Sequence, residues 1–252
     1  MSGHSKWSTI KRQKGVTDAR RGQLFTKLGR EIAVAIRHGG SDPEANFKLR
    51  LAVQRAREHN MPLGTIDRAI KRAAGKDSNE STLAEVVYEG YGPGGAALLL
   101  HAVTDNRNRT VAEVRSTFTR NGGSMAEAGS VAWNFQSKGV ITVAASGDSA
   151  EEVALSAIDA GAEDVNIEDS TLEVYTAPEK LETVRKSLEE QQIPVQSAEL
   201  SMVPKNTVRL DDKVGMQTLR LLDRLEELDD VQRVYSNADF PPEVLEAYGK
   251  EG

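Results

Sequence analysis

The first third of the chain carries apolar residues at helical spacing. An apolar residue falls at every fourth position from Leu24 to Ile36, which predicts a helix with one buried stripe. Thr17 is expected to cap the start of this helix, and the glycine pair at 39–40 is expected to end it. Residues 1–16 have neither helical nor strand periodicity, and we predict a mobile basic arm there.

Two shorter helices follow in the pattern. Asp42 and Pro43 suit the cap and the first position of a second helix, and the turn at residues 60–62 breaks it. A third helix is expected over about Leu63 to Ala74, because Gly75 stops it. The three helices predict a small bundle with basic outer faces.

Beyond a polar linker the pattern changes to strands. Residues 86–91 and 96–103 predict two strands that are joined by a glycine-rich turn at residues 92–95. That turn has no Gly-Lys-Ser/Thr sequence, so it is a tight hairpin turn and not a phosphate-binding loop. Residues 110–119 predict an amphipathic helix, and Asn108 is expected to cap it.

The next stretch alternates between strands and helices. A strand is expected at residues 131–135, and the order β-α-β-β-α-β over residues 139–203 predicts a ferredoxin-like unit. The strand, helix and strand expected over residues 207–235 cannot form a core alone. We therefore expect them to complete the strands and helix of residues 82–122.

The predicted architecture is multidomain, with α and α+β parts. It comprises a basic helical bundle, a discontinuous α+β domain, and a ferredoxin-like α+β domain inserted into the second. These domains are predicted at residues 1–76, at 77–130 with 204–252, and at 131–203.

Charge divides the chain at the end of the bundle. Residues 1–76 hold 17 Lys and Arg against 6 Asp and Glu, a net charge of +11, whereas residues 77–252 hold 15 against 32, a net charge of −17. The overall charge of −6 therefore conceals a basic module on an acidic body. So high a positive density in a segment of this size favours a polyanionic partner over chance.

Composition and missing motifs exclude several classes of protein. Without cysteine, the chain forms neither disulfides nor thiolate metal sites. No apolar run reaches membrane-spanning length and the N-terminus lacks the apolar stretch of a secretory signal, so we expect a cytoplasmic protein. The histidines at 4, 38, 59 and 101 lack metal-ligand spacing, and no catalytic motif is present. We expect no enzyme, metal, cofactor or small-molecule substrate.

Carboxylate runs near the C-terminus have two interpretations. Asp211–Asp212, Glu226–Glu227 and Asp229–Asp230 form either a divalent-cation site or a solvated helix face. The solvated face is favoured, because acidic runs on helices are commonly exposed.

The predicted nucleic-acid contacts lie mainly in the arm and the bundle. Each Lys or Arg that neutralises a phosphate releases condensed counterions, so affinity is expected to fall steeply with salt. Arginine also binds phosphate bidentately and stacks on bases. The candidates are Lys6, Trp7, Lys11, Arg12, Lys14, Arg20, Arg21, Lys27, Arg30, Arg68, Lys71, Arg72, Arg107 and Arg109.

Several of these candidates keep an alternative. Trp7 either stacks on an unpaired base or docks the arm on the bundle as a hydrophobic staple. The second and third helices resemble a helix-turn-helix, but any two short bundle helices share that pattern, and single-stranded or structured RNA suits a flexible arm better. Arg107 and Arg109 lie in a polar loop, where they either contact RNA or protein or are solvated.

Five motifs resemble the YebC/PmpR family, and the likeness covers nearly the whole chain. Five motifs in the same order are far more specific than any one alone. They are GHSKW (Gly3–Trp7), RGQLFTKL (Arg21–Leu28), YEGYGPGG (Tyr88–Gly95), DNRNRT (Asp105–Thr110) and GSVAW (Gly129–Trp133). The family includes the mitochondrial translational activator of cytochrome oxidase.

The resemblance implies the same three domains and a non-enzymatic role in gene expression. Members are described as DNA-binding transcriptional regulators, and also as ribosome-associated translation factors that assist elongation through stalling sequences. The partner is thus DNA or ribosomal RNA, and the motifs do not decide between them. A third alternative is an adaptor whose basic face meets an acidic protein. We expect no membrane partner. The sequence does not determine the oligomeric state, although a monomer is favoured.

Overall fold

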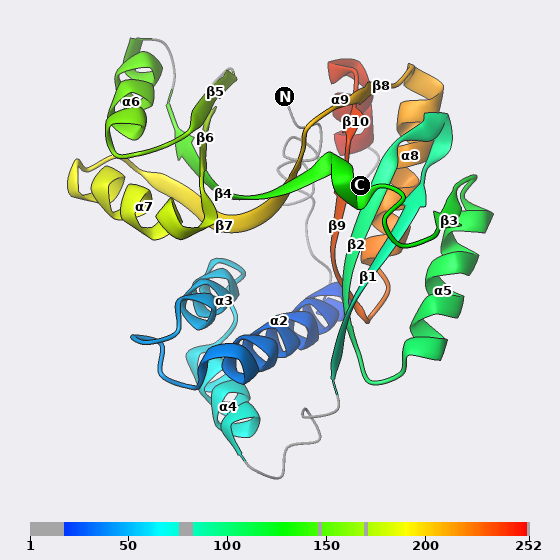
Figure 1. Cartoon of the computed structure of the whole chain (residues 1–252), viewed down its shortest axis with the longest axis horizontal. Helices are drawn as coiled ribbons and strands as arrows, with labels where there is room; N and C mark the ends of the chain where they lie inside the picture. The colour runs from blue at the N-terminus through cyan, green and yellow to red at the C-terminus, as the bar shows by residue number, and fades with distance from the viewer. Residues whose placement is uncertain (1–17, 76–82, 146–147, 169–170, 251–252) are drawn as a thin grey trace. The chain divides into compact units, whose positions relative to one another are not determined.

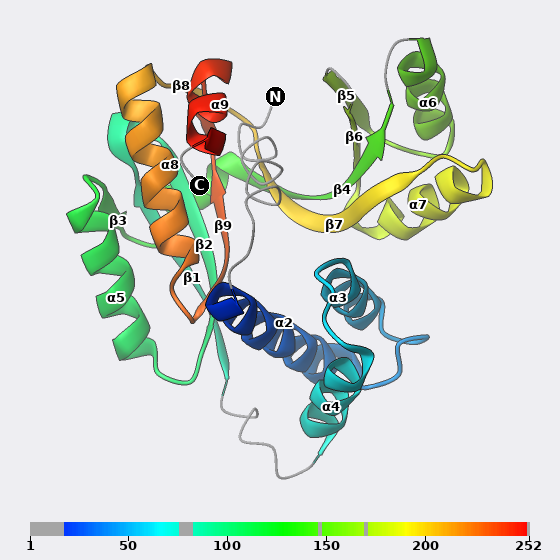
Figure 2. The same ribbon diagram turned by 180° about the vertical axis from the view of Figure 1, so that it is seen from behind.

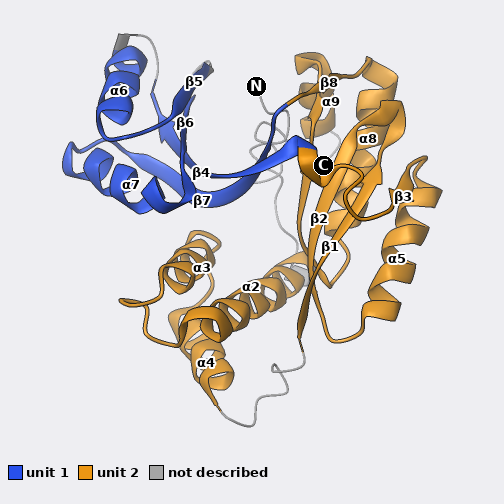
Figure 3. Cartoon of the chain, viewed as in Figure 1, with its two compact units in different colours: residues 1, 134–205 blue, residues 2–133, 206–252 orange. Residues whose placement is uncertain are grey.

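The residues described by the computed structural model divide into two compact units (Figure 3). The described ranges are 18–75, 83–145, 148–168 and 171–250. One unit comprises residues 134–205, and the larger one comprises the described residues before 134 and after 205. Both the N-terminal helices and the mixed α+β parts that the sequence predicts are present.

Three helices form a bundle at the start of the larger unit (Figures 1 and 2). They are α2 (Asp18–Gly39), α3 (Phe47–Glu58) and α4 (Leu63–Ala74). The stripe predicted on the first helix packs against the other two, and each fully buried Leu or Ile there stabilises the fold by about 1.5–3 kcal/mol. The buried members of this core are Leu28, Ile32, Ala35, Ile36, Leu49, Ala52, Ala56, Met61, Ile66 and Ala69.

The second helix begins four residues later than the sequence predicts. Asn46, and not Asp42, is its N-cap, because the Asn46 side-chain oxygen accepts from the Leu49 amide at 3.1 Å. The Asn46 side-chain nitrogen also donates to two backbone carbonyls at the end of α2, at 2.7 Å each. Asp42 instead accepts from the Glu44 amide at 2.9 Å, in the turn before the helix. A buried side chain with three partners determines where the helix starts.

A four-stranded antiparallel sheet forms the rest of the larger unit. Its strands β1 (Ala84–Tyr91), β2 (Ala97–Thr104), β3 (Ser124–Ala126) and β9 (Val231–Ser236) lie in the order β3-β1-β2-β9. The pairing of β9 with β2 brings the C-terminal part of the chain into this sheet. β1 and β2 are joined by a 3-10 turn in which Gly94 has a φ of 71°, an angle that favours glycine.

Two helices, α5 (Arg107–Arg120) and α8 (Asp212–Glu226), pack against the sheet and against each other. They share one apolar core with it, in which Phe118 is fully buried. α5 begins earlier than predicted, and its cap is Asn106 and not Asn108. The Asn106 side-chain oxygen accepts from the amide three residues later at 3.1 Å.

Short elements near the C-terminus complete this unit. β8 (Val208–Arg209) pairs in parallel with β10 (Ala238–Asp239), and α9 (Pro242–Lys250) packs on α8. The pattern of the sequence predicts β8 but neither β10 nor α9. A two-residue strand carries no periodicity, and α9 buries only three residues over little more than one turn.

The smaller unit follows the order that the alternation predicts. Its elements are β4 (Phe135–Ala144), α6 (Asp148–Asp159), β5 (Asp164–Glu168), β6 (Thr171–Thr176), the 3-10 turn Pro178–Lys180, α7 (Leu181–Glu190) and β7 (Val195–Pro204). The sheet is antiparallel with the order β5-β6-β4-β7. Alternate residues of β4, such as Ile141 and Val143, are fully buried, as a sheet with one covered face requires.

The strand predicted at residues 131–135 is wrong over most of its length. Ala132–Asn134 forms a 3-10 turn, and β4 begins at Phe135. The amides of Val131 and Ala132 donate to the carboxylate of Glu89 at 2.7 and 2.8 Å. These donors are therefore not available to a strand ladder.

Candidate nucleic-acid interface

The five candidates of the N-terminal arm lie outside the described residues. They are Lys6, Trp7, Lys11, Arg12 and Lys14. Their contacts with nucleic acid, and both interpretations of the tryptophan, stay predictions. The remaining nine candidates lie on α2, α4 and α5.

Three cations of α2 contact an acidic turn of the same unit. This acidic turn, residues 226–230, joins α8 to β9, and both views place it beside the N-terminal part of α2 (Figures 1 and 2). Arg20 donates to the carboxylate of Glu227 at 2.9 Å. Lys27 and Arg30 donate to backbone carbonyls of the turn at 2.5 and 2.7 Å. Residues predicted to bind phosphate thus bind oxygen atoms of the protein itself.

Asp230 is the buried centre of this contact, with a side chain that is 1% exposed. Its Oδ1 accepts from Arg30 at 3.0 Å. Its Oδ2 accepts from Arg109 and Thr110 at 2.7 Å each, and from Thr104 at 3.0 Å. Burial by itself raises the pKa of Asp230, but Arg109 and the two hydroxyl groups outweigh it and hold the pKa below its ordinary value. One charged carboxylate therefore joins α2, β2 and α5.

The acidic turn is not the solvated helix face that the sequence favours. Glu227 and Asp230 bind arginines of other elements, and a third carboxylate of the C-terminal runs, Asp211, caps α8 by accepting from the Val214 amide at 2.9 Å. Among the described residues, no group of acidic and histidine side chains is placed to hold a metal ion. Sequence reasoning missed these roles because Arg20 and Glu227 are 207 residues apart. The only feature of the sequence that indicated such pairing was the opposite net charge of residues 1–76 and 77–252.

A second set of ion pairs joins α2 to the sheet. Arg37 and His38 both lie 2.7 Å from the same carboxylate oxygen of Glu85 on β1. Glu31 accepts from Arg233 of β9 at 3.3 Å. One side of α2 is thus used to hold the bundle against the rest of the unit.

The cations of α3 and α4 have a different environment. Arg68, Lys71 and Arg72 are exposed on α4, and Arg68 donates to a threonine hydroxyl of its own helix at 2.9 Å. Lys48 and Arg57 are exposed on α3, and sequence reasoning did not single them out. Within the described part of the chain, the side chains of Lys48, Arg57 and Lys71 make no hydrogen bond or ion pair. These three cations are accessible to a polyanion.

The remaining candidates lie at helix starts. Arg21 is exposed on α2, and Arg107 is exposed in the first turn of α5. Arg109 is not simply solvated: besides Asp230, it pairs with Asp105 at 2.8 Å. Its place is therefore in the Asp230 contact.

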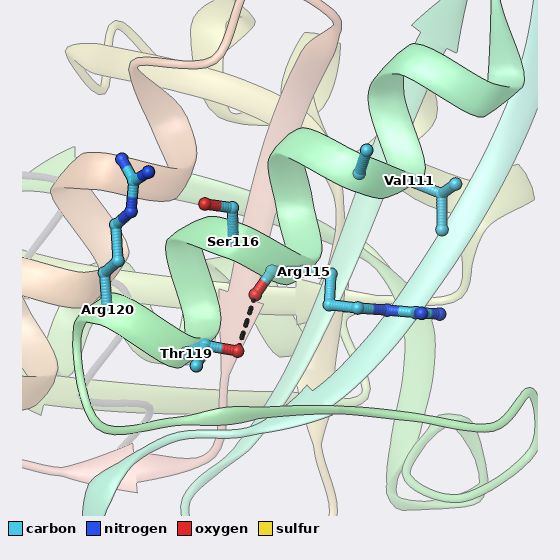
Figure 4. Close-up of a pocket in the computed structure, with 6 residues that line it drawn as sticks. Val111, Arg115, Ser116, Thr119 and Arg120 are labelled. Atoms are coloured by element: carbon cyan, nitrogen blue, oxygen red, sulfur yellow. Dashed lines mark hydrogen bonds between the residues drawn. The ribbon is translucent and has the colours of Figure 1, made fainter.

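The exposed side of α5 is hollowed, but its side chains do not converge. Figure 4 shows Arg115 and Arg120 pointing in different directions, and the Thr119 hydroxyl donating to the Arg115 carbonyl at 3.0 Å. The lining residues are Val111, Ala112, Arg115, Ser116, Thr119 and Arg120. All come from one helix, so no second element helps to enclose a ligand.

A second buried carboxylate, Glu89, organises the loop before β4. Its Oε1 accepts from the Gly129 amide at 2.6 Å, and its Oε2 accepts from the amides of Val131 and Ala132. Burial by itself raises the pKa of Glu89, but the three amide donors outweigh it, so the pKa lies below its ordinary value. Two sequence motifs, Tyr88–Gly95 and Gly129–Trp133, therefore meet at one carboxylate for a structural reason.

No described helix has the length and apolar character that a membrane crossing needs.

Two family models together match most of the chain. The one described as the TACO1/YebC protein N-terminal domain matches residues 5–76. The one described as the TACO1/YebC second and third domain matches residues 83–238.

Individual proteins are similar over almost their full length. A probable transcriptional regulatory protein of Dehalococcoides mccartyi is 56% identical over 248 residues, which is 98% of this chain and 98% of that protein. One from Chloroflexus aggregans is 54% identical over 251 residues, covering 98% and 99%. The crystal structure of a conserved hypothetical protein from Aquifex aeolicus has 46% sequence identity and a TM-score of 0.80, covering 89% of this chain and 92% of that chain.

Proposed function

The chain belongs to the TACO1/YebC family, and from that premise we propose that it is a cytoplasmic, non-enzymatic regulator of gene expression that binds nucleic acid. The names of its relatives, probable transcriptional regulatory proteins, support the regulatory role. We assign nucleic-acid binding mainly to the basic N-terminal third, because the net negative charge of the α+β parts repels phosphate.

The separation of charge along the chain is the observation that carries this proposal. Residues 1–76 have a net charge of +11 in a protein whose overall charge is −6. A phosphate that contacts an exposed lysine or arginine releases counterions, which drives binding. Lys48, Arg57 and Lys71 have no protein partner in the described chain, so a phosphate can bind them without first breaking an ion pair or hydrogen bond.

The proposed interface combines the arm with the exposed cations of the bundle. The arm contributes Lys6, Trp7, Lys11, Arg12 and Lys14, and the bundle contributes Arg21, Lys48, Arg57, Arg68, Lys71 and Arg72. Arg107 is a further exposed candidate on α5. Lys27, Arg30 and Arg109 have a structural role, because phosphate would have to break their contacts with the acidic turn.

Charge reversal in the arm tests the proposal. Binding of the full chain to a short labelled DNA duplex and to a ribosomal RNA hairpin is measured by fluorescence anisotropy over a range of salt concentrations. The affinity is expected to fall with salt, with a slope of about 0.9 per phosphate contact on the duplex. Replacing Lys11, Arg12 and Lys14 by Glu is expected to lower the affinity by about tenfold or more. An unchanged affinity would favour a protein-binding adaptor instead.

Fractionation of ribosomal particles decides which nucleic acid is the target. The wild type and a form without the arm are sedimented with ribosomes at two salt concentrations. Co-sedimentation that depends on the arm, together with weak and unselective DNA binding, would assign ribosomal RNA and a translational role. Retention of one DNA duplex against excess competitor, without co-sedimentation, would assign transcription.

A further inference from the structure

Glu227 bridges two arginines that come from different helices. Its Oε1 accepts from Arg20 Nη2 at 2.9 Å, and its Oε2 accepts from Arg224 Nη1 at 2.8 Å. Arg20 lies in the first turn of α2, and Arg224 lies in the last turn of α8. We call the two guanidinium groups the arginine clamp. Each oxygen of the carboxylate therefore has its own arginine.

The clamp is exposed, unlike the pair between Arg30 and Asp230. The side chains of Arg20 and Arg224 are 57% and 66% exposed, and that of Glu227 is 33% exposed. Ion pairs at this exposure are weak and screened by salt, whereas the side chain of Asp230 is 1% exposed and has three further donors. Another ligand can therefore replace Glu227 on Arg20 and Arg224 while the pair of Arg30 with Asp230 continues to hold α2 in place.

A phosphate group suits the same two arginines. Guanidinium groups bind carboxylate and phosphate oxygens with the same fork of N–H donors, and nucleic-acid phosphates are strong competitors for such donors. Glu227 is also the C-cap of α8, where unpaired helix carbonyls make an acidic side chain unfavourable. Release of Glu227 from the clamp therefore leaves a side chain that gains by turning toward water.

We propose that Arg20 and Arg224 form a binding site for a backbone phosphate, which Glu227 occupies in the free protein and which nucleic acid takes by displacing it. The inference rests on the proposed function, because it adds a phosphate contact of Arg20 and Arg224 to that interface. Its ligand is a phosphodiester, a group that DNA and RNA share. Sequence reasoning indicates Arg20 alone, since only the fold brings Arg224 beside it.

Neutralising Glu227 opens the site and gives the first test. Glu227→Gln in the full chain is expected to raise the affinity for a short DNA duplex or an RNA hairpin by about two- to fivefold, the range that one exposed ion pair supports. The slope of log affinity against log salt is expected to steepen by about 1, because one more phosphate contact releases counterions. Glu246→Gln on α9 is the matched control, since it removes the same charge from an exposed position outside the clamp.

Arg224→Gln separates a phosphate site from a general effect of charge. In the wild type, where Glu227 closes the clamp, this substitution is expected to change the affinity by less than about twofold. In the Glu227→Gln background it is expected to remove the whole gain. Thermal unfolding checks that each variant keeps the fold, which is expected because the three substituted side chains lie at partly or fully exposed positions.

The outcomes distinguish this inference from the proposed function. Equal gains in Glu227→Gln and Glu246→Gln, or additive effects of Glu227→Gln and Arg224→Gln, would overturn the clamp while leaving nucleic-acid binding intact. Failure of every protein, the wild type included, to bind duplex and hairpin would overturn both. A gain for only one of the two probes identifies the nucleic acid whose phosphates reach the clamp.

Discussion

Asp230 and Glu89 each collect several hydrogen-bond donors on one buried carboxylate. Burial of a charged group is unfavourable unless it is paired, and here charged and polar donors compensate. Asp230 belongs to a carboxylate run and Glu89 to the motif Tyr88–Gly95, but neither pattern indicates the donors that these side chains bind. At the residue scale, the buried acids connect the elements of this protein, and two cations that suggested nucleic acid, Arg30 and Arg109, are partners of Asp230.

Asp230→Asn is expected to destabilise the protein by about 2–4 kcal/mol, because it leaves Arg30 and Arg109 without their shared charged partner. The free energy of unfolding in urea measures the effect. Asp229→Asn is the matched control: its exposed Oδ1 accepts from Gln23 Nε2 at 2.8 Å, a contact that an asparagine oxygen keeps, so its effect is expected to stay within about 0.5 kcal/mol. Equal effects of the two substitutions would contradict the central role of Asp230.

Acid is expected to remove the stabilisation that Glu89 provides. Its pKa is lower in the folded state than in the unfolded chain, so the unfolded chain binds more protons in acid. The contribution is therefore fully present above the unfolded pKa of about 4.3 and is lost as the pH falls through the folded pKa. Urea unfolding of the wild type and Glu89→Gln from neutral to acidic pH measures this.

The difference in stability between wild type and Glu89→Gln is expected to be largest near neutrality and to shrink in acid. Glu127→Gln, at an exposed position just before the same loop, is the control and is expected to change little at any pH. A difference between wild type and Glu89→Gln that does not vary with pH would show that the charge of Glu89 is not what matters.

At the scale of elements, periodicity located most helices and strands, and side-chain contacts moved their ends. The third helix lies where the spacing predicts it, at Leu63–Ala74. α3 and α5 are capped by Asn46 and Asn106, although Asp42 and Asn108 are equally suitable residue types. A cap forms where the backbone geometry and further partners support it, and the residue type alone does not determine this.

Asn46→Ala is expected to lower the free energy of unfolding by about 2 kcal/mol, because it removes the cap of α3 and leaves two carbonyls at the end of α2 without their donor. Asp42→Ala removes only an exposed turn contact and is expected to cost less than about 1 kcal/mol. Chemical denaturation compares the two. A larger loss of unfolding free energy in Asp42→Ala than in Asn46→Ala would identify Asp42 as the cap of α3.

At the scale of the whole molecule, the basic third is not uniformly available to a partner. One side of α2 binds carboxylates and carbonyls of the larger unit, whereas Lys48, Arg57 and Lys71 are exposed without such contacts in the described chain. Net charge therefore overstates the number of cations that are accessible to nucleic acid.

Replacing Lys48 and Lys71 by Gln is expected to weaken nucleic-acid binding and to reduce the salt slope by about 0.9 for each duplex phosphate that no longer has a cation beside it. Anisotropy titrations of the full chain at several salt concentrations measure both. The same substitutions at Lys180 and Lys186, exposed lysines of the smaller unit, change the net charge equally and serve as the control. A similar decrease in the control would show that binding follows total charge and not the bundle surface.

Part of the candidate site could be predicted from the sequence. Charge density indicated the basic third, and the motif Asp105–Thr110 indicated a loop of importance. Sequence reasoning did not find the roles of Glu227 and Asp230, because Arg20 and Arg109 reach them only after distant segments pack. It also missed Arg224, which lies three residues before Glu227 but comes beside Arg20 only in the fold. Contacts across about 200 residues leave no periodic signal, since periodicity reports only on neighbours within one element.

The sequence by itself determined the helical bundle, the α+β parts, most element positions and the concentration of positive charge, because these depend on local spacing and on counts of residues. Only the tertiary structure decided which charges meet. The attraction between two charges weakens within a few ångströms of separation in space. That separation is unrelated to the number of residues between them along the chain. Packing thus placed Arg20 and Arg30 against acids of the same protein and left the lysines of α3 and α4 exposed.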